Sequence, residues 1–253
     1  TELNNLGKEK EALRSIEAMP KLSGNRAWTI LGNTRRSNRL YKGAIAAYQI
    51  AIVEDSDFFL PLSNAVECIE LSGLLGELSP IRELVAARVD SAPLYGLIEG
   101  RIALLEGRPR SAAAAFREKL VVDGEILTPE EVVHKFYDVS DLSIPHSASL
   151  EWHVLFARSL AKSRDYESLQ ILFNAVNSWP EWWNGDWQVM AAEALRVNGE
   201  VDKAFAQLEG MPDQAPPKIT RALLFRDQDE PVKVGEEISE IDIESVDGYS
   251  HPE

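Results

Sequence analysis

The side chains that most often carry out catalysis are few and scattered in this sequence. The four histidines never stand at metal-ligand spacing, and the single cysteine, Cys68, rules out a paired-cysteine site. No glycine-rich phosphate loop, Gly-x-Ser-x-Gly or His-Glu-x-x-His motif occurs. His153 is predicted to lie at a surface or in a groove. We therefore expect no catalytic activity, no metal and no cofactor.

Four tryptophans lie close together, at positions 179, 182, 183 and 187. Aromatic side chains at this density usually form core. The alternative is an exposed surface that binds a protein partner or stacks on a sugar. Trp182 and Trp183 are adjacent, so they cannot share one face of a helix, and we expect at least one of them to be accessible.

The composition predicts a folded chain with an acidic surface. Hydrophobic residues make up 45% of the 253 residues, and the net charge is -15. Ten acidic and one basic residue fall in 227–253 alone. Because nucleic-acid binders normally carry a basic face, this balance argues against nucleic acid and anionic lipid as partners.

No apolar stretch approaches the ~20 residues that span a bilayer. With only one cysteine, the chain forms no internal disulfide, which favours the cytoplasm or another reducing intracellular compartment. The first ten residues show no signal-peptide pattern, although the chain begins without Met, so a removed signal stays open.

The elements that could position a binding site emerge from an internal repeat. The clearest unit combines small and large residues at fixed offsets: Trp28, Leu31, Gly32, Ala44, Tyr48 and Ala51. Small residues let two antiparallel helices touch, and the large ones fill the space beside them. This spacing predicts a first helix over 26–38 and a second over 42–54. The small-residue position recurs at 12, 44, 80, 112, 168 and 204.

This pattern resembles the tetratricopeptide repeat (TPR), a unit of about 34 residues. The resemblance covers roughly residues 1–217 and is best over 25–58 and 149–182. It implies an all-α, right-handed superhelical solenoid of antiparallel helix pairs. Departures from the family pattern are Arg35, Pro80 and Lys119. A non-repetitive helical bundle that mimics the spacing is the alternative.

One step of the repeat is too long by about 22 residues. Thr128-Pro129-Glu130-Glu131 is a good helix start, which predicts an extra helix over 129–138 followed by a loop. We therefore predict an N-terminal array (1–120), an inserted linker (121–147), a C-terminal pair of repeats (148–217) and a last segment (218–253).

The last segment is expected to begin with a capping helix over 218–226. Beyond Asp227 the chain is acidic, and its apolar residues are spaced more like a strand than a helix. We expect a non-repetitive acidic tail, either disordered or extended along a surface.

The TPR resemblance also implies where a partner binds, because first helices line a concave groove in that family. The groove positions of the best unit are Arg26, Thr29, Asn33 and Arg36, and Arg101 stands at one in the third unit. Guanidinium groups fork onto carboxylates, so this set is expected to receive a protein segment or an acidic peptide.

Two functions remain open at this point. The first is a non-catalytic interaction scaffold or adaptor, with membership in a larger assembly as a variant. The second is a docking or regulatory region of an enzyme, or a carbohydrate-binding solenoid that uses Trp182 or Trp183. Because TPR scaffolds serve unrelated tasks, the resemblance does not identify the partner.

Overall fold

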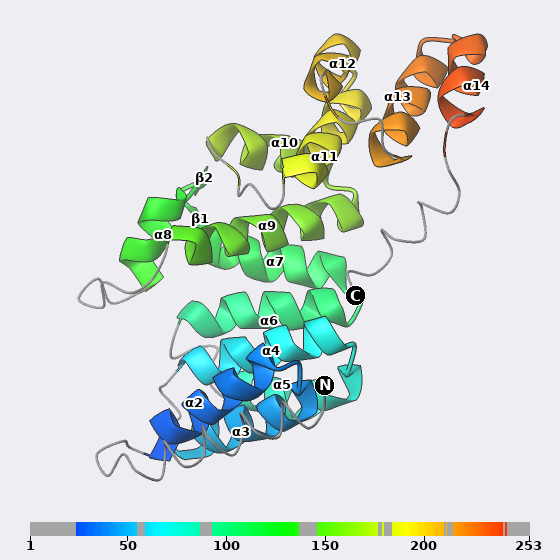
Figure 1. The fold of residues 1–253 in the computed structure, drawn as a ribbon. Helices are drawn as coiled ribbons and strands as arrows, with labels where there is room; N and C mark the ends of the chain where they lie inside the picture. The colour runs from blue at the N-terminus through cyan, green and yellow to red at the C-terminus, as the bar shows by residue number, and fades with distance from the viewer. Residues whose placement is uncertain are drawn as a thin grey trace. The chain divides into compact units, whose positions relative to one another are not determined.

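The computed structural model describes residues 24–54, 59–86, 93–136, 146–176, 179, 184–209, 211, 215–239 and 241. These residues form two compact units, within residues 1–115 and 116–253, and helix α7 runs across the division. Figure 1 labels the helices. The predicted second helix around residues 12–19 lies outside the described residues.

Helices follow one another in antiparallel pairs, as predicted. In the first unit these are α2 (Gly24–Ser37) with α3 (Tyr41–Glu54), α4 (Phe59–Ser72) with α5 (Leu78–Ala86), and α6 (Pro93–Leu105) followed by α7 (Pro109–Leu120). In the second unit they are α9 (His146–Ser163) with α10 (Tyr166–Ala175), α11 (Asn184–Val197) with α12 (Val201–Leu208), and α13 (Ala215–Asp227) with α14 (Pro231–Ser239).

A left-handed residue ends the first helix of each pair. These residues have φ between 59° and 81°, and they are Arg39, Gly73, Gly107, Arg164, Gly199 and Asp229. At the first of these turns the Leu40 N–H donates to the Arg35 carbonyl at 2.9 Å, which satisfies a helix-end carbonyl. The same bond recurs after every one except Gly73, which is followed by the 3-10 turn Leu75–Glu77.

The α2–α3 pair packs as the repeat pattern predicts. Ala44, Tyr48 and Ala51 are fully buried. A Cβ on Gly32 would overlap the ring of Tyr48, so only glycine fits at this crossing. The small residue therefore brings the two backbones close enough for the tyrosine ring to fill the space between them.

The inserted segment contains the predicted short helix, α8 (Pro129–Phe136), and a two-stranded hairpin that was not predicted. The hairpin pairs β1 (Val121–Val122) with β2 (Glu125–Ile126). Helix α8 packs on α9. The prediction of a surface histidine is wrong: His153 is fully buried, with Nε2 2.7 Å from the Leu127 carbonyl.

Two predicted marker positions are wrong by one residue. Pro80 is exposed and Ser168 is only partly buried, whereas their neighbours Ile81 and Leu169 are fully buried. In the α9–α10 pair the left-handed turn residue is Arg164, and the Leu169 N–H donates to the Asp165 carbonyl as the Ala44 N–H donates to Leu40. The buried position is therefore Leu169.

The same shift moves the groove positions of α9. The TPR pattern over 149–182 assigns the groove positions to Leu150, His153, Ala157 and Leu160, and all four are buried. When α9 is aligned with α2 on its turn residue, Arg164, each groove position moves to the next residue in the sequence.

The C-terminal segment also differs from its prediction. The expected capping helix is present as α13, but residues 231–239 form helix α14 and are neither extended nor disordered. Side-chain contacts hold this helix against α13: Lys233 lies over the Phe225 ring, and Glu237 accepts from Arg221 at 2.9 Å. Over 231–239 the strand-like spacing was misleading because α14 buries little of its apolar surface: Val232 is 73% exposed. The rest of the predicted tail, 240 and 242–253, lies outside the described residues.

Candidate functional site

Residues at matching positions of α2, α4 and α6 lie on one face of each helix. On α4 they are Leu60, Glu67 and Leu71, at spacings of seven and four residues, which places them on one helical face. Equivalent positions, 34 residues earlier or later, are Arg26, Asn33 and Ser37 on α2 and Leu94, Arg101 and Leu105 on α6. We call these residues, with Ile30, Arg36 and Glu70, the first-helix face.

A polar network joins α2 to α4 within this face. Asn33 Oδ1 accepts from the Tyr48 hydroxyl at 2.7 Å and from Asn64 Nδ2 at 3.0 Å. Arg36 Nη1 donates to Asn64 Oδ1 at 3.4 Å and forms an ion pair with Glu67. The predicted groove residues Asn33 and Arg36 are therefore brought together, but both are bound to neighbouring side chains.

A second ion pair joins α4 to α6. Arg101 donates to Glu70 Oε2 from Nε at 2.9 Å and from Nη2 at 2.6 Å. The arginine side chain is 5% exposed and the glutamate 29% exposed. The chain's own carboxylates therefore balance the charges of Arg36 and Arg101.

Not all predicted residues are accessible. Thr29 is buried, and its hydroxyl donates to the Asn25 carbonyl at 2.7 Å, so the structure differs from the expectation that it lines an open groove. Arg101 is buried too. Arg26 is exposed on the first turn of α2.

Apolar side chains complete the face. Ile30, Leu60 and Leu71 are 38%, 47% and 47% exposed, and Leu94 and Leu105 are half-buried. The prediction gave weight to the arginines and missed Leu60 and Leu71. The signal that finds them is the 34-residue equivalence of the turn residues Arg39, Gly73 and Gly107.

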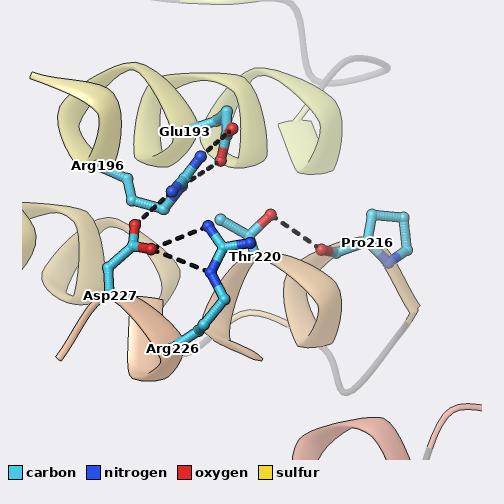
Figure 2. Close-up of polar contacts among 6 residues, drawn as sticks. All are labelled: Glu193, Arg196, Pro216, Thr220, Arg226 and Asp227. Atoms are coloured by element: carbon cyan, nitrogen blue, oxygen red, sulfur yellow. Dashed lines mark hydrogen bonds and ion pairs between the residues drawn. The ribbon is translucent and has the colours of Figure 1, made fainter. Parts of the chain in front are cut away.

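The second unit uses the same kind of link between first helices. Arg196 on α11 donates to Glu193 at 2.8 and 2.7 Å and forms an ion pair with Asp227 on α13. Asp227 also accepts from Arg226 at 2.9 Å, as Figure 2 shows. These hydrogen bonds, Glu193 first, raise the pKa of Arg196, so its charge is permanent. The network ties α11 to α13.

The described residues of the tryptophan cluster pack against one another and are partly buried. Trp179 and Trp187 stack with ring centroids 6.4 Å apart, and Phe173 lies edge-on to Trp179 at 5.3 Å. Trp182 and Trp183, the predicted accessible pair, lie outside the described residues.

The described ranges contain a buried cysteine and no candidate metal site. Cys68 is fully buried on α4, and burial raises the pKa of its thiol to about 11. Across these ranges, no group of three or more His, Cys, Asp or Glu side chains is placed to hold a metal ion. No described helix is both long and apolar enough to cross a membrane.

Comparisons with known proteins support the repeat architecture. No protein-family model and no curated protein matches the chain. Among solved structures, a tetratricopeptide repeat protein from Parabacteroides merdae ATCC 43184 is similar, with a TM-score of 0.50 and 12% sequence identity. The match covers 94% of this chain and 86% of that one. The likeness shows a TPR-like repeat fold.

Proposed function

We propose that this TPR-like chain is a non-catalytic scaffold or adaptor that binds a segment of a partner protein on the first-helix face. TPR-like folds generally serve as protein-interaction scaffolds. The observation that carries the proposal is the face itself. It joins exposed apolar side chains to polar side chains that bonds between helices hold in place. A surface fixed in this way loses little side-chain freedom when a partner binds.

The proposal assigns the chain no catalytic role. Arg36, Arg101 and Arg196 each have a carboxylate partner within the chain, so these charges serve the array itself. Membership in a larger assembly extends the same function, with the partner as a permanent subunit.

Site-specific photo-crosslinking tests the binding surface. A benzoylphenylalanine in place of Leu60 on the first-helix face is compared with one in place of Ile50, an exposed residue of α3 outside the face. In extracts of the cells that make the protein, we expect one protein to crosslink at position 60 and not at position 50. Equal crosslinking at both positions, or none at 60, would contradict this function.

A further inference from the structure

The chemistry of the first-helix face indicates what kind of segment it accepts. Three of its apolar residues, Ile30, Leu60 and Leu71, are each more than a third exposed. They come from α2, from the first turn of α4 and from the last turn of α4. Leu60 and Leu71 lie on one side of α4, where a partner segment running along the helix would contact both.

Four of the five charged side chains on the same face form ion pairs with one another. Arg36 is paired with Glu67, and Glu70 is paired with Arg101. An acidic segment that approached either arginine would also approach the glutamate bound to it, and the like charges would repel. Only Arg26, at the edge of α2, has no carboxylate partner among the described ion pairs on this face.

We propose that the first-helix face binds an uncharged, apolar segment of a partner protein, with Leu60 and Leu71 as its main contacts. This inference rests on the proposed function and specifies its partner. It replaces the acidic peptide expected from Arg26, Arg36 and Arg101. The ion pairs Arg36–Glu67 and Glu70–Arg101 join α2 to α4 and α4 to α6. The leucines bury apolar surface against the partner.

Selection from a phage-displayed library of short random peptides on the full-length protein tests the proposal. We expect the selected peptides to be rich in Leu, Ile, Val and Phe and to carry little charge. Their affinity should change little between low and high salt, because no new ion pair forms on binding.

Matched variants locate the peptides. Leu60→Glu and Leu71→Glu each place a carboxylate on the face, while Ile50→Glu places one on α3 at a similar exposure of 39%. We expect the selected peptides to bind each face variant at least about tenfold more weakly than the wild type. Binding to Ile50→Glu should stay unchanged. Circular dichroism and urea unfolding confirm that all three variants stay folded.

The outcomes separate this inference from the function on which it rests. Acidic peptides that lose affinity for Arg26→Glu would overturn the apolar partner but keep the face as a binding surface. Apolar peptides that bind Leu60→Glu and Ile50→Glu equally would overturn both. A failure to enrich any peptide would overturn the inference, as would a wild-type dimer that Leu60→Glu converts to monomer.

Discussion

The guanidinium of Arg101, buried on α6, donates two hydrogen bonds to one oxygen of Glu70 on α4. The two residues are 31 positions apart, as are Arg36 and Glu67 in the preceding pair of helices and Arg196 and Asp227 in the second unit. Each pair joins the last turn of one first helix to the next first helix. Side chains that a partner could have used thus hold the array together.

Removal of one member of the buried pair should be costly. Glu70→Gln removes the carboxylate that accepts two hydrogen bonds from buried Arg101, and we expect a loss of about 3 kcal/mol in the free energy of unfolding. Urea unfolding followed by circular dichroism measures it. The control is Arg82→Ala, which breaks an exposed pair with Glu106 and should cost no more than ~0.5 kcal/mol. Equal losses in the two variants would contradict the role of burial.

The close crossing of α2 and α3 gives a second prediction. In Gly32→Ala the new methyl group would lie within 2.8 Å of three carbons of the buried Tyr48 ring. We expect a loss of about 1–3 kcal/mol in unfolding free energy, because the helices must separate or the ring must move. Gly235→Ala on α14 has nothing within 4 Å and should stabilise the chain by about 0.5–1 kcal/mol. Destabilisation by both substitutions would mean that helix crowding is not the cause.

The start of α8 predicts a dependence on pH. The Thr128 N–H donates to Glu131 Oε2 at 2.7 Å, and the Glu131 N–H donates to the Thr128 hydroxyl at 3.3 Å. The bond from the Thr128 backbone, and then that from its side chain, hold the pKa of Glu131 below its ordinary value of 4.5. The carboxylate therefore stabilises the folded state fully above 4.5, and this contribution is lost as the pH falls through the lowered pKa.

The comparison uses Glu131→Gln. Its urea midpoint should fall below that of the wild type at neutral pH, and the difference should shrink as the pH drops below 4.5. Glu99→Gln, an exposed site on α6, controls for the loss of a carboxylate elsewhere. A constant difference across this range would show that the charge of Glu131 does not support α8.

The left-handed turns give a fourth prediction. Arg164 has φ 62° between α9 and α10, a conformation that glycine adopts at lower cost. Arg164→Gly should stabilise the second unit by roughly 0.5–1 kcal/mol. The reverse exchange, Gly107→Arg at φ 71°, should destabilise by about the same amount. Thermal unfolding of the two variants beside the wild type measures both, and shifts of the same sign would refute the explanation.

Local patterns in the sequence predicted much of the fold. The α2–α3 pair followed from Gly32 and Tyr48, because a small residue opposite a large one fixes where two helices cross. Helix α8 followed from Thr128 and Pro129, whose capping role depends on neighbouring residues alone. The short hairpin and helix α14 were missed, because two-residue strands and a mostly exposed helix leave little hydrophobic pattern.

The site was harder to predict. Arg36 and Arg101 could be placed on one face, but their carboxylates, Glu67 and Glu70, belong to a different helix. Such pairs become visible only when the units are in register, and in α9 the register was one residue off. The small-large spacing alone could not distinguish Ser168 from Leu169, because each has a large residue four positions later.

The ion pairs between residues 31 positions apart require the helix pairs to follow one another in their present order. Helix α2 presents a cation, Arg36, to α4, whereas α4 presents an anion, Glu70, to α6. A tandem duplication of α4–α5 would set Glu70 of the first copy against Glu67 of the second, two carboxylates at one joint. Unequal recombination that adds a single unit therefore places two like charges where an ion pair would otherwise form. This repulsion favours a fixed number of units in this part of the chain.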